Sequence, residues 1–229
     1  MPFQSNHNIR LAAASLLALL LSSYLFANNS HAEELRNISK ISKVNGGIRV
    51  SANEQVGEVS SVNGGIDIGR NARATVVETV NGGIEIEDGA AIDSAETVNG
   101  GIRVDGNVTV RRSLETTNGG IRIGSGSNVG GSVETVNGKI SLNNTHVGDS
   151  VITTNGDVLI AKGSVVEGDV IFEGRRRSWT RWFNWTNKPP ELAIDSDAEV
   201  KGDIRLYHKV TLKIAEGAQV GDIKRHYRD

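Results

Sequence analysis

Apolar and polar residues alternate in short runs along most of this chain. Ile48-Arg49-Val50 and Ile66-Asp67-Ile68 both read apolar–polar–apolar, which is the period of a strand with one buried face. The same order returns at Ile84-Glu85-Ile86, Ile102-Arg103-Val104 and Ile121-Arg122-Ile123. The pattern predicts a series of short strands in which the aliphatic side chains point into a core and the charged side chain points to solvent.

A short motif, Val-Asn-Gly-Gly-Ile, leads into these strands and first occurs at Val44. A repeat this regular indicates that each unit is one layer of a stacked structure. We therefore expect the Ile that ends the motif to form a column through the core, continuing as Ile140 and Val158 where the motif loosens. The Asn of the motif recurs at nearly constant intervals, at Asn45, Asn63, Asn81, Asn99, Asn118, Asn137 and Asn155.

Two further strands complete each layer. One precedes the Asn, as in Val77-Glu78-Thr79-Val80, and a less regular one fits residues 72–76, 108–110 and 165–166. Asn-Gly is expected to supply a corner between strands, because both residues tolerate positive φ. Three short strands and three corners in about 18 residues predict one turn of a parallel β-helix.

The predicted fold is therefore all-β, a right-handed parallel β-helix (solenoid) with about 18 residues per coil. A left-handed β-helix has coils of similar length, but its hexapeptide repeat gives a marker about every six residues. The marker in this chain recurs once per coil, which favours the right-handed form.

The stacked Asn residues of the motif have two structural interpretations. Stacked Asn side chains form ladders of amide hydrogen bonds. Alternatively, Asn is simply the residue that best fits a left-handed corner. Neither interpretation gives the Asn column a catalytic role.

The repeat is interrupted at Glu173-Gly174, where Asn-Gly is due. It resumes at Glu191, so the coil 161–194 is almost twice as long as the coils before it and contains an insertion. Two further turns follow at 200–204 and 220–223, and the charged tail 224–229 is expected to cap the rod, as terminal repeats require. We predict one β-helix domain over residues 33–229, with an insertion loop at 175–190.

The insertion reverses the local sign of charge. It carries four Arg and one Lys and no acidic residue, whereas the rest of the chain after residue 32 has 19 basic and 27 acidic residues. It also contains all three Trp residues. Basic residues with Trp suit an anionic lipid surface, and Arg pairs with phosphate or carboxylate on a glycan. The candidate binding residues are Arg175, Arg176, Arg177, Trp179, Arg181, Trp182 and Trp185.

An alternative interpretation places this insertion against the rod. Large aromatic side chains are mostly buried, so the Trp residues would pack on the coils while the Arg residues face an outward column of Glu. That column is expected to be solvated and partly neutralised by nearby Arg residues, or else to hold a cation. Its members are Glu78, Glu96, Glu115 and Glu134, and the Arg residues are Arg103, Arg111, Arg112 and Arg122.

Residues 1–32 have the pattern of a secretory signal peptide. Arg10 precedes an apolar run over 11–27, which is shorter than the roughly 20 residues of a membrane-spanning helix. Small residues end the segment at Ala32, where we expect cleavage; the alternative is an uncleaved anchor. The chain has no Cys, which excludes disulfides, thiol catalysis and a lipidated N-terminal Cys. We expect an exported bacterial protein, periplasmic or extracellular.

Few sequence features point to chemistry. The chain has no G-x-S-x-G, H-E-x-x-H or phosphate-loop motif. We therefore expect no catalytic set, cofactor or metal site. A formal net charge of −2 also gives no indication of nucleic-acid binding.

Two family resemblances accompany these motifs. The Thr-Val-Asn-Gly-Gly-Ile repeats over residues 41–160 resemble the adhesin-like β-strand-repeat domains of exported bacterial proteins. Residues 161–223, with Val200-Lys201-Gly202-Asp203-Ile204 and Val220-Gly221-Asp222-Ile223, resemble bactofilins, the polymer-forming bacterial scaffold proteins. Both resemblances imply a right-handed β-helix and no catalysis.

Three functions are consistent with these features. The first is a non-enzymatic, adhesin-like scaffold that binds a cell-envelope lipid, glycan or protein through the 175–188 loop, with peripheral membrane contact. The second is a polymer of rods joined end to end, because the ends of a β-helix expose unpaired strand edges. The third is a polysaccharide-active enzyme, which would need paired carboxylates in a cleft.

Overall fold

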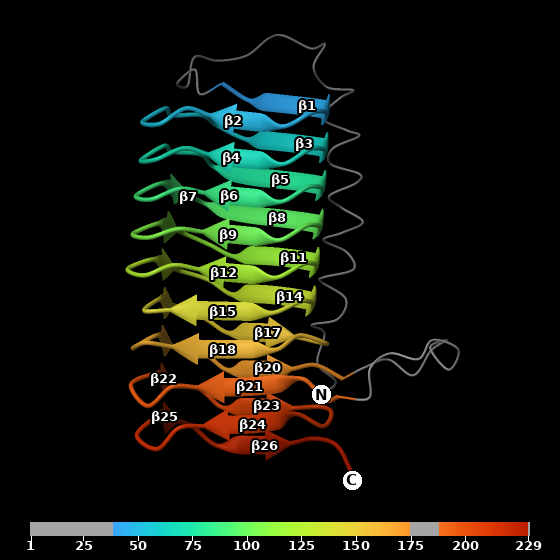
Figure 1. The fold of residues 1–229 in the computed structure, drawn as a ribbon, viewed down its shortest axis with the longest axis vertical. Coiled ribbons are helices and arrows are strands. Elements are labelled where there is room, and N and C mark those ends of the chain that lie inside the picture. Colours follow the sequence, from blue (N-terminus) through green and yellow to red (C-terminus); the bar gives the residue numbers. More distant parts are fainter. Residues whose placement is uncertain (1–38, 175–187, 229) are drawn as a thin grey trace, which may run out of the picture.

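A computed structural model of the chain describes residues 39–174 and 188–228. The chain winds around a single long axis, and its strands stack into three parallel β-sheets that run along this axis (Figure 1). Each coil contributes one strand to each of two longer sheets, and most coils add a very short strand to a third. The fold is the parallel β-helix that the repeat predicts. The predicted signal peptide and most of the insertion, including all seven candidate binding residues, lie outside the described residues.

We name the three sheets A, B and C. Sheet A has ten strands: β1 (Ile41–Asn45), β3 (Val59–Asn63), β5 (Val76–Asn81), β8 (Ser94–Asn99), β11 (Leu114–Asn118), β14 (Val133–Asn137), β17 (Val151–Thr153), β20 (Val170–Phe172), β23 (Ile204–Leu206) and β26 (Ile223–Arg225). Sheet B has nine: β2 (Ile48–Val50), β4 (Ile66–Ile68), β6 (Ile84–Ile86), β9 (Ile102–Val104), β12 (Ile121–Ile123), β15 (Ile140–Asn143), β18 (Val158–Ala161), β21 (Glu191–Ile194) and β24 (Thr211–Ile214). Sheet C has seven: β7 (Ala91–Ile92), β10 (Thr109–Val110), β13 (Asn128–Val129), β16 (His146–Val147), β19 (Val165–Val166), β22 (Glu199–Val200) and β25 (Gln219–Val220).

The register of sheet B confirms the predicted aliphatic column. Ile48 pairs with Ile66, and the column continues coil by coil to Val158. Val158 then pairs with Leu192 across the insertion, and Leu192 pairs with Leu212 in the next coil. The coils therefore differ in length while their strands keep one register.

The core is a thin aliphatic stack, as predicted. The outer residues of each apolar–polar–apolar strand are buried, and the middle residue is half-buried or exposed. Among the described residues, Phe172 is the largest fully buried side chain. It pairs with Thr153 of the preceding coil and takes the same inward position in sheet A. β-Branched side chains suit this narrow, pleated interior.

Sheet A buries a hydroxyl where hydrophobicity alone would place a Val. In β5, Val77 and Thr79 point inwards and are fully buried, so Glu78 and Val80 point outwards. Four buried Thr residues of sheet A donate their hydroxyls to glycine carbonyls of the preceding coil, which satisfies an acceptor at each corner. These bonds join Thr79 to Gly64, Thr97 to Gly82, Thr116 to Gly100 and Thr135 to Gly119, over 2.7–2.9 Å.

The Asn residues of the motif form the amide ladder that was one of the two interpretations. Asn63 Nδ2 donates to Asn45 Oδ1 over 3.1 Å, and the bonds continue to Asn155 over 2.9–3.0 Å. The prediction that Asn occupies this corner because it tolerates positive φ is wrong. None of the ladder Asn residues is among the described residues with positive φ. Asn45 to Asn137 are the last residues of sheet A strands, and Asn155 lies two residues beyond β17.

At the Asn-Gly corner Gly46 has positive φ (96°), but positive φ recurs coil by coil at a second corner, between sheets B and C, which the sequence prediction missed. It is adopted there by Asn53 (61°), Asn71 (56°), Asn107 (55°) and Asn144 (48°), and by Gly89, Gly126 and Gly163 in other coils. Asn and Gly tolerate the left-handed region best. Their recurrence at the same place in successive coils is a second, weaker repeat signal in the sequence.

The third strand is shorter than predicted. Residues 72–76 do not form a strand: Arg73 makes only isolated bridges to Gln55 and Ala91, and β5 begins at Val76. β10 covers two of the three residues in 108–110, and β19 matches 165–166. Two residues are enough for a sheet C strand because a corner turns the chain directly before and after it.

The C-terminal tail contributes to the end of the rod. Residues 223–225 form β26, and the rings of Tyr207 and His226 stack with centroids 4.6 Å apart. Tyr227 packs against the core. The last coil nevertheless keeps its apolar residues only partly buried, including Leu212, Ile214, Val220 and Ile223, so the tail covers this end incompletely.

Candidate binding surfaces

The insertion lies at a corner between sheets A and B. One coil earlier, this corner runs only from Thr153 in β17 to Val158 in β18, which pair with Phe172 in β20 and Leu192 in β21. The predicted range 175–190 falls entirely between β20 and β21. Because the strands on both sides keep the register of the rod, the extra residues are an addition to a corner rather than a break in the fold.

The residues at the two ends of the insertion are held by the rod. The backbone N–H of Glu191 donates to Asp157 Oδ1 over 2.9 Å, and Pro190 is buried. Glu173 is 5% exposed, and its Oε2 has no hydrogen-bond partner among the described residues. Burial raises the pKa of Glu173. Residues 175–187 themselves, and the predicted binding role of their Arg and Trp side chains, lie outside what the structure describes.

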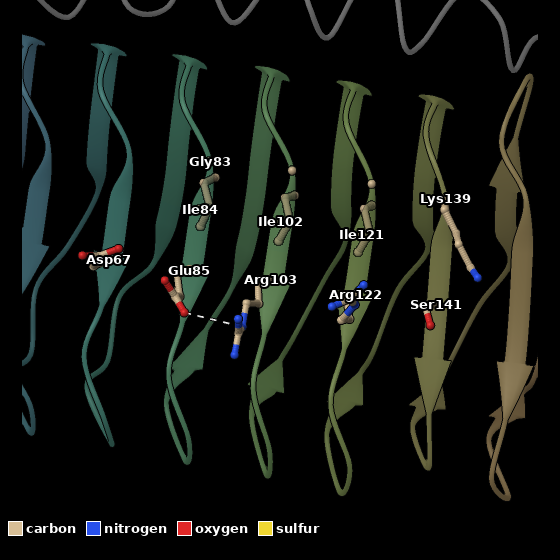
Figure 2. A pocket seen from close by; sticks show the side chains of 12 residues that line it. Asp67, Gly83, Ile84, Glu85, Ile102, Arg103, Ile121, Arg122, Lys139 and Ser141 are labelled. Atoms are coloured by element: carbon tan, nitrogen blue, oxygen red, sulfur yellow. Dashed lines mark ion pairs between the residues drawn. The ribbon is translucent and has the colours of Figure 1, made fainter.

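A groove runs along the outer face of sheet B, across β4, β6, β9, β12 and β15 (Figure 2). Its volume is about 450 Å³. Gly83, Gly101 and Gly120 form its floor, one from each of three successive coils. The charged middle residues of the strands line it, together with one residue of β15 and the residue before that strand: Asp67, Glu85, Arg103, Arg122, Lys139 and Ser141.

The groove is open because glycine occupies one outward position in successive coils. Lys139 takes the place of that glycine in the coil after Gly120, just before Ile140, which pairs with Ile121, so this position accepts a side chain. A Cβ on Gly83 would lie 3.3 Å from Gly101 O, which is closer than an ordinary contact, and a Cβ on Gly101 or Gly120 would lie 2.9 or 2.8 Å from a carbonyl oxygen of the next coil. The glycine before each of these is more restricted, because a Cβ on Gly82 would overlap the Gly64 carbonyl. The corner therefore excludes a side chain at the first glycine of the motif, whereas the second is crowded to a smaller degree, less at Gly83 than at Gly101 or Gly120.

The glycine carbonyls of the groove floor are hydrogen-bonded within sheet B. Ile66 N donates to Gly83 O, Ile84 N to Gly101 O and Ile102 N to Gly120 O, each over 3.0 Å. These ladder bonds use acceptors that would otherwise recognise a ligand. Acceptors for a ligand in the groove are therefore supplied by the side chains of its wall.

Charge is distributed unevenly along that wall. Glu85 lies 3.5 Å from Arg103 (Figure 2). Asp67 pairs with Arg49 over 2.7 Å, and Arg103 also contacts Asp105 over 3.0 Å. The other half of the groove has two cations, Arg122 and Lys139, that make no direct ion pair with any residue that the structure describes. The pKa of Glu191, lowered mainly by its hydrogen bond from Lys213, is also lowered by Lys139. The sequence predicted Arg103 and Arg122 only as residues that neutralise the Glu column, and it gave Lys139 no role.

The predicted Glu column lies on the outer face of sheet A, with Glu78, Glu96, Glu115 and Glu134 in register. It is half-buried rather than solvated. Burial, followed by the neighbouring carboxylates, raises the pKa of Glu96 and of Glu134 to about 7, and burial also raises the pKa of Glu78.

The expected neutralisation by Arg is wrong for the residues that the structure describes. Arg103 and Arg111 pair with other acids, Arg111 with Asp93 over 2.8 Å, and Arg112 bonds to Ser94. Serine hydroxyls contact two members of the column instead: Ser113 donates to Glu115 and Ser132 to Glu134. The stacked carboxylates are therefore stabilised by hydroxyl donors and by retained protons rather than by cations.

Sheet C carries a small polar cluster at its outer edge. His146 Nε2 lies 2.9 Å from Glu167 Oε1, to which Lys201 Nζ also donates over 2.9 Å. His146 Nδ1 lies 2.7 Å from Asn128 Oδ1. Hydrogen bonds from Lys201 and His146 lower the pKa of Glu167. Across residues 39–174 and 188–228, no three His, Asp or Glu side chains are placed to hold a metal ion.

Comparison of the chain with protein-family models, with curated proteins and with solved structures finds no match. The resemblances to adhesin-like repeat domains and to bactofilins therefore stay predictions from sequence. In the described part of the chain, no helix is long and apolar enough to span a membrane.

Proposed function

We propose that this protein is a non-enzymatic, exported scaffold of the bacterial cell envelope, a rod that presents the insertion 175–190 to an anionic envelope component. The observation that carries the proposal is the unbroken register on both sides of the insertion, with Val158 paired to Leu192. The fold does not need this segment, yet the segment contains all the Trp residues and reverses the local charge. We infer that it is retained because it binds a partner. Such a binding role is adhesin-like in the sense that the resemblance implies.

The groove supports a binding role. Both carboxylates that line it are placed beside arginines, Asp67 beside Arg49 and Glu85 beside Arg103. Carboxylates placed in this way can accept hydrogen bonds from the hydroxyl groups of a ligand, which suits recognition.

A corner replacement tests the proposal without disturbing the rod. Replacing residues 174–190 by Asn-Gly restores the short corner that joins Thr153 to Val158, and its Gly avoids the overlap that a Cβ would make with the preceding coil. The intact protein is expected to bind lipopolysaccharide or anionic vesicles and the replacement variant is not, at unchanged far-UV circular dichroism.

A second variant separates charge from length. An insertion of unchanged length in which Arg175, Arg176, Arg177 and Arg181 are replaced by Ser should also lose binding. Undiminished binding by either variant, or no binding by the intact protein to any anionic envelope component, would overturn the proposal.

End-to-end assembly is a second candidate, favoured by a separate observation. The last coil leaves Leu212, Ile214, Val220 and Ile223 partly exposed, beside the unpaired edges of β24, β25 and β26. Apolar side chains next to free strand edges favour association with another chain. Sedimentation velocity of the intact protein and of Val220→Glu would decide: concentration-dependent oligomers abolished by the substitution support assembly, and a monomer at high concentration refutes it.

A further inference from the structure

We propose that the sheet B groove is a binding site for a linear acidic glycan, with a carboxylate of the glycan held between Arg122 and Lys139. This site is distinct from the insertion, which leaves the rod at the same corner of sheet B two coils beyond Lys139. It therefore does not depend on the envelope-binding role proposed above.

The shape of the groove fits an extended ligand. Neighbouring strands are about 4.8 Å apart, so the four steps from β4 to β15 give a length of about 19 Å. A volume of about 450 Å³ spread over that length makes a narrow trough rather than a compact pocket. A chain of several linked rings lying along the axis of the rod matches this form.

The floor of the groove favours flat ring faces. Gly83, Gly101 and Gly120 present bare peptide planes, and their carbonyls accept hydrogen bonds within sheet B. Such a surface makes van der Waals contact with the C–H faces of sugar rings but offers few free acceptors. The hydroxyl and acid groups at the ring edges would then meet the side chains of the wall.

The charges of the wall select the acidic group and its position. Arg122 and Ser141 stand in register on β12 and β15, and Lys139 directly precedes β15, so one end holds a hydroxyl and two cations that make no direct ion pair with the described residues. A guanidinium binds carboxylate in a bidentate manner, and a nearby ammonium adds to the attraction.

The opposite end of the groove favours neutral rings. Asp67 and Glu85 there accept hydrogen bonds from sugar hydroxyls even while they pair with Arg49 and Arg103. A polymer with one charge on every unit, such as a nucleic acid, would place its phosphates against these carboxylates. The favoured ligand is thus a glycan in which uronic acids alternate with neutral sugars.

The test uses the purified full-length protein and isothermal titration with defined oligosaccharides. An alternating uronate-containing hexasaccharide is the probe, with a neutral hexasaccharide and an inorganic polyphosphate of similar length for comparison. We expect measurable binding of the acidic oligosaccharide, at least tenfold weaker binding of the neutral one, and weak binding of polyphosphate.

Three variants connect binding to the groove. The double variant Arg122→Gln and Lys139→Gln should weaken binding of the acidic oligosaccharide at least tenfold. Gly83→Gln should also weaken it by filling the floor, at a position where a Cβ meets only one close atom, Gly101 O at 3.3 Å. Arg111→Gln changes an exposed arginine beside β10, outside the groove, and should leave binding unchanged. Thermal unfolding of each variant checks that the fold persists.

Several outcomes would overturn the proposal. These are equal affinity for the acidic and neutral oligosaccharides, unchanged affinity in the double variant, or no binding of the acidic oligosaccharide. Tighter binding of polyphosphate than of the oligosaccharide would identify a phosphate polymer as the ligand and would equally refute an acidic glycan. Binding that persists after the 174–190 corner replacement is expected, because the groove and the insertion are separate.

Discussion

Glu96 and Glu115 lie directly opposite each other on the adjacent parallel strands β8 and β11. Like charges in this relation destabilise a sheet, and the effect is stronger where the side chains are half-buried. The pKa of Glu96 is raised to about 7 by burial and by Glu115 and Glu78. At neutral pH a carboxyl of this column therefore still holds a proton for part of the time.

The raised pKa predicts that the rod loses stability as pH rises. The folded-state pKa of Glu96 and Glu134 is about 7, above the value of an unfolded Glu, so folding takes up protons between these values. Their contribution is intact at pH 4.5 and is lost as pH rises through about 7. Glu96→Gln should raise the free energy of unfolding at pH 8 by roughly 1 kcal/mol and change it little at pH 4.5.

Chemical denaturation at the two pH values measures this effect. Glu216→Gln is the matched control, because Glu216 is exposed in the loop before β25 and stands outside the column. A gain in stability for Glu96→Gln of the same size at both pH values would contradict the assignment of a raised pKa.

The two glycines of the motif should respond differently to substitution. A Cβ on Gly82 would overlap the Gly64 carbonyl of the preceding coil, whereas a Cβ on Gly83 would lie 3.3 Å from Gly101 O. Gly82→Ala is therefore expected to destabilise the rod by roughly 3 kcal/mol, and Gly83→Ala by about 1 kcal/mol or less. Urea denaturation of the two variants compares them directly; equal losses would show that the coils relax around the added methyl group.

The buried hydroxyl column gives a third prediction. Thr97 Oγ1 donates to Gly82 O over 2.9 Å, and Thr97→Val keeps the shape of the side chain while removing the donor. The carbonyl then stays buried without this bond, at a cost of about 1–2 kcal/mol. Thr97→Ser keeps the hydroxyl and should lose less. The midpoint of thermal unfolding distinguishes them, and a Val variant as stable as the wild type would mean that the hydroxyl contributes nothing.

The amide ladder gives a fourth. Asn99 Nδ2 donates to Asn81 Oδ1, and Asn99 Oδ1 accepts from Asn118 Nδ2, so Asn99→Ala removes two bonds. Asn45→Ala, at the end of the ladder, removes only the bond from Asn63. We expect a loss of about 1 kcal/mol for the central position and about half of that for the terminal one. Similar losses at both positions in urea denaturation would argue against a ladder and for a purely local role of each Asn.

Most of the fold could be predicted from the repeat motif, because the recurring Asn marks the same position in each coil and so gives the register of the strands. Ile48, Ile66 and their successors could be assigned to a column from the spacing alone. Thr79 and Val80 could not, because hydrophobicity favours Val inside while the buried Gly64 carbonyl needs a hydroxyl. The left-handed corner was assigned to Asn45 and its equivalents, since the conspicuous Asn-Gly pair obscured the weaker series that begins with Asn53.

The groove was not predicted because it depends on what successive coils leave out. No single coil contains a cleft: Gly83, Gly101 and Gly120 form a floor only when they stack. The sequence also does not show which cations are in ion pairs. Arg103 pairs with Glu85 and Asp105, whereas Arg122 makes no ion pair with the described residues. The half-burial of the Glu column was missed for a related reason, since it arises from packing between coils.

The register of β5, β8 and β11 has a consequence for the length of the molecule. Each of these coils repeats one inward aliphatic residue, the same inward Thr, the same ladder Asn and the same glycine corner. Gain or loss of one whole coil would leave the joints on either side matched and would change the rod by about 4.8 Å. The length of this protein is thus quantised, and duplication or deletion of one unit of the gene would lengthen or shorten it without a new fold.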